Sequence, residues 1–205
     1  PKSISQKNGL AKRLLDLIGA SLGLLVILPF TPLIALAIKF DSAGPVLVAL
    51  PRISEGKLIR VYKFRSMIER ADSLKAALMH LNERNDGPFF KITHDPRLTR
   101  TGKFIRKFRL DEFPQLINVL RGELSLVGPR PHEPGEVKHY PEEYGEIIRA
   151  RAGVTGFSQV NGASSLPFLK ELQLDRHYLK NQNLFFDLKI LGKTAAILFF
   201  DPTAV

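Results

Sequence analysis

The longest apolar stretch of the chain runs from Leu17 to Ile38 without a charged side chain. As a helix rising about 1.5 Å per residue it reaches roughly 33 Å, enough for the hydrocarbon core of a bilayer. Pro29 and Pro32 interrupt it, and each proline removes a backbone donor and favours a kink or break. The pattern predicts an apolar helix with a sharp bend at these prolines.

Positive charges flank this stretch on both sides, with Lys12 and Arg13 before it and Lys39 and Arg52 after it. Basic flanks favour the cytoplasmic side, so a helix that breaks, enters and leaves on one side of the membrane satisfies both. A kinked single-pass anchor and a buried core helix are the alternatives. A secretory signal peptide is disfavoured, because charged residues follow the run where a small-residue cleavage site would be needed.

The rest of the chain predicts a compact mixture of helices with one hairpin. Alternating apolar residues from Pro45 to Met67, with a turn at residues 54–56, predict a β-hairpin. Apolar residues spaced by three and four from Ile68 to Glu83 predict an amphipathic helix, followed by a loop at residues 85–88. Further helices are expected at 103–108, 114–122, 142–149 and 166–179, with a glycine-bearing loop at 153–162.

The segment Leu184–Phe200 mixes apolar clusters with three charged residues. It predicts a helix that either lies at a membrane interface or packs on the core, and the pattern does not decide between them. We expect a mostly helical α/β fold in three parts: the basic N-terminus and membrane helix (1–40), a catalytic domain (41–183), and a C-terminal amphipathic helix and tail (184–205). Residue 1 is proline, so we expect the chain to belong to a longer product.

Composition narrows the chemistry. The net charge of +10 fits a phosphate-rich partner, which leaves nucleic acid, anionic lipid and nucleotide substrates open. The absence of cysteine excludes disulfides, thiol nucleophiles and cysteine-ligated metals. The sequence also lacks the glycine-rich phosphate loops, the nucleophile elbow and the HExxH spacing of other enzyme classes.

The densest group of reactive side chains surrounds Asp111 and Glu112, which follow a run of six basic residues between Arg97 and Arg109. A carboxylate among cations stays ionised, and it can attack a phosphate or bind Mg²⁺. Adjacent helical residues point about 100° apart, so we expect different roles for the two acids. The alternative is that both merely favour the N-terminus of the helix that starts at Pro114.

Three further basic residues are candidates for phosphate binding. Arg130 lies between two prolines, so its stiff backbone presents the guanidinium at little entropic cost. Lys63 and Arg65 alternate with apolar neighbours and are placed on one face of a strand. Solvated surface charges are the simpler reading of each taken alone.

Many short segments, in order along nearly the whole chain, resemble the monotopic phosphoglycosyl transferases, the bacterial sugar transferase family that includes undecaprenyl-phosphate sugar phosphotransferases. The matching segments are Lys12-Arg13 with Asp16, Pro29, residues 62–67 (YKFRSM), 95–102 (DPRLTRTG), 110–116 (LDEFPQL), 118–122 (NVLRG), 125–131 (SLVGPRP), 153–156 (GVTG) and 159–162 (QVNG), Asp175 with Tyr178, and 187–191 (DLKIL).

The resemblance implies a re-entrant membrane helix broken at proline and a small α/β catalytic domain with amphipathic interfacial helices. It implies a ping-pong reaction at the cytoplasmic face of the bacterial inner membrane, in which Asp111 is the nucleophile and metal ligand, Glu112 is its partner, and Mg²⁺ is the cofactor. A nucleotide-sugar, expected to be a UDP-sugar, donates a sugar 1-phosphate to polyprenyl phosphate, as the first membrane step of glycan assembly. The expected substrate-binding and phosphate-binding residues are Lys63, Arg65, Arg106, Arg130 and Asp175.

Four positions depart from the family pattern: Leu28, Leu50, Ala152 and Ala163. Leu50, Ala152 and Ala163 motivate a second hypothesis, a catalytically weak member that acts as a membrane scaffold in glycan assembly. A nucleic-acid-binding module ranks last, because no recognition motif accompanies the positive charge. The sequence leaves open the sugar, the polyprenol length and whether the chain forms a homo-oligomer.

Overall fold

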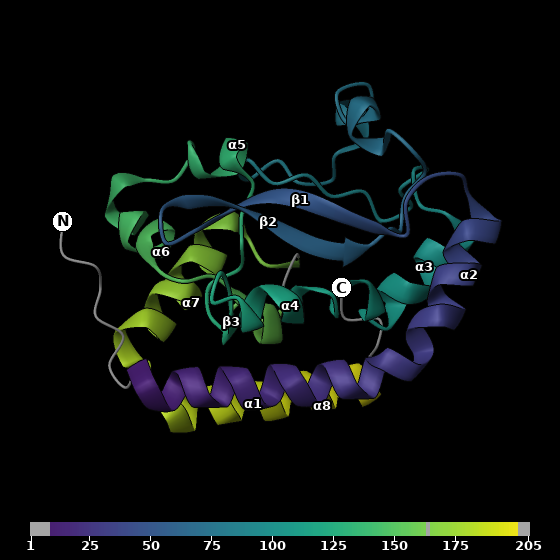
Figure 1. The fold of residues 1–205 in the computed structure, drawn as a ribbon. Coiled ribbons are helices and arrows are strands. Elements are labelled where there is room, and N and C mark those ends of the chain that lie inside the picture. The colour runs from purple at the N-terminus through teal and green to yellow at the C-terminus, as the bar shows by residue number, and fades with distance from the viewer. Residues whose placement is uncertain (1–8, 163–164, 201–205) are drawn as a thin grey trace.

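The computed structural model describes residues 9–162 and 165–200, and the fold is mostly helical with small sheets, as the sequence predicts. A long bent helix and the last helix of the chain run along one side of the body, as Figure 1 shows. With η for a 3₁₀ helix, the elements are α1 (Gly9–Ile27), η1 (Leu28–Phe30), α2 (Thr31–Asp41), β1 (Leu47–Ser54), β2 (Lys57–Phe64), η2 (Ala71–Leu74), η3 (Met79–Leu81), α3 (Arg100–Lys107), η4 (Leu110–Glu112), α4 (Gln115–Leu120), β3 (Ser125–Val127), α5 (Pro134–Val137), η5 (Glu142–Tyr144), α6 (Gly145–Arg149), β4 (Gly153–Thr155), η6 (Gln159–Asn161), α7 (Phe168–Asn181) and α8 (Leu184–Phe200).

The apolar helix breaks at the prolines, as predicted. Pro29 lies in the single turn η1 between α1 and α2, and Pro32 lies in the first turn of α2. The Thr31 hydroxyl donates to the Ile27 carbonyl at 3.2 Å, a side-chain bond that spans the break. Figure 1 shows α2 leaving the direction of α1 at this point.

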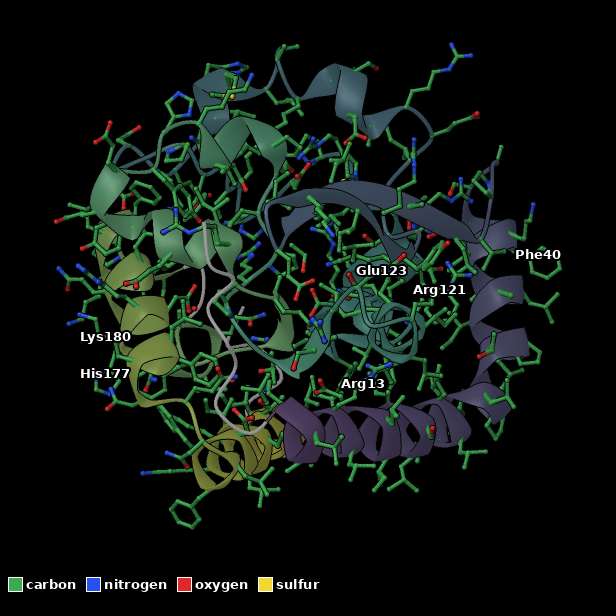
Figure 2. All side chains as sticks on the ribbon, turned by 60° about the vertical axis from the view of Figure 1, so that its left-hand side comes forward. Arg13, Phe40, Arg121, Glu123, His177 and Lys180 are labelled. Atoms are coloured by element: carbon green, nitrogen blue, oxygen red, sulfur yellow. The ribbon has the colours of Figure 1, made fainter. Side chains whose placement is uncertain are left out.

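Most apolar side chains of this bent helix face outward. In the part of the chain that the structure describes, Gly9–Asp41 is the one stretch long and apolar enough to cross a membrane, and little of it is buried. Phe40 is 87% exposed and points away from the body at the end of α2 (Figure 2). A soluble monomer rarely exposes so large an apolar face, so this side of the molecule fits an apolar environment.

Two glycines allow α1 to lie directly on the body. A Cβ atom added to Gly19 would stand 2.5 Å from Leu126 Cδ1, and one added to Gly23 would stand 2.6 Å from Leu116 Cδ1. Arg13 strengthens the contact, because its guanidinium donates to the Val119 and Leu120 carbonyls at the end of α4, at 2.7 Å each (Figure 2). Helix α1 is therefore packed closely against α4 and β3.

Buried polar contacts join α1 to the far end of the sequence. Lys12 is 3% exposed, and its amine donates to Asp187 Oδ2 of α8 at 2.8 Å, to the Val127 carbonyl at 2.9 Å and to the Tyr178 hydroxyl at 3.2 Å. Asp16 accepts two hydrogen bonds from β3. The predicted helix at Leu184–Phe200 is confirmed, and one side of it packs on the core through buried Asp187 and Ile190.

The predicted hairpin is confirmed. Strands β1 and β2 pair antiparallel with Val48 opposite Lys63, and Glu55 and Gly56 form the turn with positive φ angles. The predicted loop at 153–162 is wrong in its first part, because residues Gly153–Thr155 form β4, parallel to β3. A strand of three residues is too short for an alternating pattern, and its pairing partner is far away in the sequence.

The helix predicted from Ile68 to Glu83 is wrong, because this segment forms only the turns η2 and η3. The periodic leucines have little to pack on: Leu74 is 40% exposed and Leu81 is 42% exposed. Arg70 also adopts a left-handed backbone with φ 58° just before η2. A helix of this length depends on packing of its apolar face, so the periodic spacing of apolar residues did not suffice to form a helix without a surface to pack on.

The remaining predicted helices are present, with starts shifted by one to three residues for three of them. Helix α3 begins at Arg100, earlier than predicted, because the Thr99 hydroxyl accepts from the Gly102 N–H at 2.9 Å and caps it. Helix α4 follows Pro114 and ends before Gly122, whose φ of 78° suits glycine. The expected helical segments at 142–149 and 166–179 correspond to η5 with α6 and to α7.

Candidate active site

Asp111 and Glu112 lie in the single turn η4, between α3 and α4. Arg109 precedes this turn with a left-handed backbone (φ 53°), and the reversal places the turn against β2. The side chain of Asp111 is 6% exposed, whereas that of Glu112 is 28% exposed. The two adjacent acids therefore have different environments, which agrees with different roles.

Lys63 of β2 contacts both carboxylates. Its amine lies 2.6 Å from Glu112 Oε1 and 3.7 Å from Asp111 Oδ2. Burial raises the pKa of Asp111 above its usual value although Lys63 opposes the change. Burial also acts to raise the pKa of Glu112, but the charge and hydrogen bond of Lys63 outweigh it and lower that pKa. Glu112 thus holds the lysine, and Asp111 is left as the less stabilised carboxylate.

Three arginines add positive potential around the two acids. The positive charge of Arg106 acts to lower the pKa of Asp111, and the charges of Arg109 and Arg130 act to lower the pKa of Glu112. Arg106 Nε also donates to the Ser66 hydroxyl at 2.9 Å, which fixes the direction of its side chain. Arg130 is exposed on the loop after β3, so its guanidinium is accessible to an anion in solution.

Asp175 lies behind the Arg130 loop. It is 1% exposed on α7 and lies beside Ser158 and the backbone N–H of Arg130, and its Oδ1 has no hydrogen-bond partner. Burial raises the pKa of Asp175 to about 7. The sequence named Asp175 as a binding residue; the structure places it where it positions the backbone of Arg130.

Arg65 and Lys63 turn to different places, although the sequence assigned them to one strand face. Arg65 is buried, and its guanidinium donates to the Ser42 carbonyl at 2.7 Å and to the Ala43 carbonyl. Strand β2 ends at Phe64, so the alternation does not extend to Arg65. Arg65 holds the connection between α2 and β1, and Lys63 alone reaches the carboxylates.

Asn118 has a positioning role that sequence reasoning missed. Its fully buried amide donates to the Arg60 carbonyl at 2.8 Å, and its Oδ1 accepts from the Tyr62 N–H at 3.0 Å. These bonds tie α4 to β2 and so set Lys63 against η4. A polar residue within the apolar run of residues 116–120 was the available signal.

Comparison with known proteins identifies the family of the chain. The model of the family described as bacterial sugar transferase matches residues 7–201. The chain belongs to the bacterial sugar transferase family.

Several curated relatives carry names that describe their reactions. The undecaprenyl-phosphate glucose phosphotransferase of Komagataeibacter xylinus is 39% identical over 99% of this chain and 38% of its own length. The UDP-glucose:undecaprenyl-phosphate glucose-1-phosphate transferase of Escherichia coli K12 is 39% identical over 98% of the chain and 43% of its length. The exopolysaccharide production protein ExoY of Rhizobium meliloti is 36% identical over 91% of the chain and 84% of its length. The chain thus spans less than half of the first two relatives.

Of the residues that are unusual for a bacterial sugar transferase, three lie in the described part of the chain, at places with little direct bearing on the two acids. Leu28 is exposed in η1, and Leu50 pairs with Val61 in the hairpin. Ala152 is buried, and its carbonyl accepts from the Ser125 N–H at 2.9 Å. Ala163 lies outside the described residues, as do Lys2 and Lys7 of the basic N-terminus.

The family resemblance implies Mg²⁺ as a cofactor of this bacterial sugar transferase, and binding it would require suitable donor groups near Asp111. Across residues 9–162 and 165–200, no cluster of three or more acidic or histidine side chains forms a metal site. Mg²⁺ commonly needs only one or two carboxylates, with water and substrate phosphate as its other ligands. The raised pKa of buried Asp111 marks a carboxylate that a further cation would stabilise, so the residues fit Mg²⁺ bound together with a diphosphate.

Proposed function

We propose that this bacterial sugar transferase moves a sugar 1-phosphate from a nucleotide-sugar, expected to be a UDP-sugar, to undecaprenyl phosphate. The products are an undecaprenyl-diphosphate-sugar and a nucleoside monophosphate. The observation that carries the proposal is a buried carboxylate, Asp111, beside the Lys63–Glu112 ion pair and among arginines. The names of the relatives, which specify undecaprenyl phosphate as substrate, support the acceptor.

The reaction is proposed to proceed in two displacements at phosphorus. An Asp111 carboxylate oxygen attacks the phosphorus that bears the sugar, and the bond from that phosphorus to the oxygen of the nucleoside monophosphate breaks. An oxygen of undecaprenyl phosphate then attacks the aspartyl phosphorus and releases the carboxylate. Mg²⁺, when bound, would spread the negative charge of the diphosphate.

Asp111 is the better nucleophile of the two acids. Glu112 is held at 2.6 Å by Lys63, and its pKa is lowered, so its oxygen is occupied and weakly basic. Asp111 lies farther from the lysine, at 3.7 Å, and its raised pKa indicates a more basic oxygen. Lys63 opposes protonation of Asp111 without occupying its oxygen, and Arg106 and Arg130 would neutralise phosphate oxygens.

The membrane placement is part of the proposal. The break at Pro29, the basic flanks and the outward apolar side chains support a re-entrant helix whose two ends stay on the cytoplasmic side. Phe185 and Leu188 on the outer side of α8 extend the same apolar surface, which supports α8 as an interfacial helix. Such a placement brings a lipid acceptor in the inner leaflet to a water-soluble donor.

The deciding experiment measures nucleoside monophosphate released by the detergent-solubilised chain with Mg²⁺, undecaprenyl phosphate and a panel of UDP-sugars. Lipid-dependent release is expected from the parent chain, and Asp111→Asn should reduce it by about 10³-fold or more. Asp72→Asn, at an exposed acid in η2, is the matched control and should retain full release. Unchanged release by Asp111→Asn would refute the nucleophile. If the parent chain releases no nucleoside monophosphate, the membrane-scaffold hypothesis would be favoured.

A further inference from the structure

An apolar cavity of about 120 Å³ adjoins the candidate active site. Glu112 and Arg109 form part of its wall, and Phe113, Leu116 and Leu198 supply apolar surface. Thr194 of α8 completes the wall, with its hydroxyl bonded at 2.8 Å to Thr155. The two-displacement mechanism assigns no group to this space.

We propose that the cavity receives the first isoprenoid unit of the lipid acceptor, with the acceptor phosphate beside Arg109. This inference rests on the proposed function and specifies where its acceptor binds. Apolar cavities of about 150 Å³ admit benzene, which has six carbons, so about 120 Å³ suits a five-carbon unit. A guanidinium and an apolar wall in one cavity match a phosphate attached to a hydrocarbon.

The position of the cavity supports a lipid occupant. Leu116 lies against Gly23 of α1, and Leu198 and Thr194 belong to α8. Figure 1 shows α1 and α8 both on the lower side of the body. The cavity therefore lies between the two acids and the apolar surface that faces the membrane in the proposed orientation. The ribose and base of a nucleotide donor would instead leave polar groups against this largely apolar wall.

The cavity is expected to align the acceptor more than to tighten its binding. A polyprenyl chain in a bilayer is already out of water, so its entry into an apolar cavity gains little hydrophobic free energy. Fixing the first unit, however, sets the distance between the acceptor oxygen and the aspartyl phosphorus, and an error of 1 Å can slow a reaction about 100-fold. Filling the cavity should therefore slow transfer to the lipid and spare the donor step.

The test uses Leu198→Trp, which fills the cavity from α8, and Ala195→Trp, which adds the same ring at an exposed position of the same helix. Steady-state rates in nanodiscs give kcat/KM for undecaprenyl phosphate and for the UDP-sugar separately. We expect Leu198→Trp to lower the acceptor value about tenfold or more and to leave the donor value within about twofold. Ala195→Trp should change neither value. Val154→Phe fills the cavity from β4 and should repeat the split if Leu198→Trp folds poorly.

A binding measurement separates this inference from the proposed function. The natural sequence contains no tryptophan, so each tryptophan variant carries a single fluorophore. Undecaprenyl phosphate should shift the emission of Leu198→Trp but not that of Ala195→Trp, and phosphatidic acid at equal concentration should shift neither. If the parent chain has no activity but the selective shift occurs, the proposed function fails and the lipid site stands. Equal acceptor kinetics for the two variants, or the absence of a selective shift, would overturn the inference.

Discussion

The buried amine of Lys12 is expected to contribute strongly to the stability of the protein by fixing α1 to α8. The substitution Lys12→Met keeps most of the side-chain volume and removes the donor to Asp187, to the Val127 carbonyl and to the Tyr178 hydroxyl. The Asp187 carboxylate then stays buried with the Tyr178 hydroxyl, at 2.6 Å, as its remaining close donor. Loss of one partner of a buried ion pair costs about 3–5 kcal/mol, because the other charge is left uncompensated.

For a chain of 205 residues, each 1 kcal/mol lowers the unfolding midpoint by about 2–4 °C. We therefore expect Lys12→Met to lower the midpoint by roughly 6–20 °C in a circular-dichroism melt in detergent. Lys180→Met is the matched control, since Lys180 is exposed on α7 (Figure 2), and it should change the midpoint by about 1 °C or less.

The double variant Lys12→Met with Asp187→Leu tests the origin of the effect. It removes both charges, and Tyr178 can still donate to the Val127 carbonyl, which lies 3.1 Å from its hydroxyl. The combined loss should therefore be smaller than the sum of the two single losses, by about 2 kcal/mol or more. Additive losses, or a Lys12→Met midpoint close to that of Lys180→Met, would refute the reasoning.

Two further predictions concern stability. The pKa of Asp175 is raised to about 7 in the folded protein, whereas the carboxyl of the unfolded chain loses its proton near pH 3.8. The folded state therefore binds the proton more tightly, and the free energy of unfolding falls as the pH rises between these two values. The fall from pH 5 to pH 7 should be about 2–3 kcal/mol. Asp175→Asn should flatten this dependence in melts at pH 5 and pH 8, and a persisting slope would contradict the assignment. Gly23→Leu should lower the free energy of unfolding by about 1–3 kcal/mol, because the added side chain forces α1 away from Leu116. Gly192→Leu is the control, because the space around Gly192 is open, and it should not lower the free energy of unfolding. Equal unfolding midpoints for the two variants would argue against close packing of α1.

Local signals in the sequence predicted much of the fold. The hairpin was predicted because its turn residues and alternation lie within one short segment, and α4 because Pro114 and Gly122 mark its ends. The break at Pro29 follows from the missing backbone donor alone. The failed helix at residues 68–83 shows the limit of periodicity, since nothing in a local pattern states whether a partner surface exists.

The candidate site depends on contacts that local patterns do not contain. The adjacency of Asp111 and Glu112 is visible in the chain, but the 2.6 Å contact from Lys63 to Glu112 joins residues 49 positions apart. Strand alternation and the family resemblance both singled out Lys63, whereas the packing of α4 through Asn118 explains its position. For Arg65 the local pattern was misleading. Strand alternation grouped Arg65 with Lys63, but β2 ends at Phe64 and the Arg65 side chain contacts the Ser42 carbonyl instead of the carboxylates.

The contact between Lys12 and Asp187 also limits how early α1 can complete its packing during synthesis. Its two residues are 175 positions apart, so the partner of this lysine leaves the ribosome long after the first helix does. At synthesis rates of about 5–20 residues per second, the delay is roughly 10–35 s. During that interval α1 can enter the membrane, but its amine must remain hydrated or bind lipid phosphate. Helix α1 is therefore made well before α8, and it completes its buried contacts only after α8 has been made.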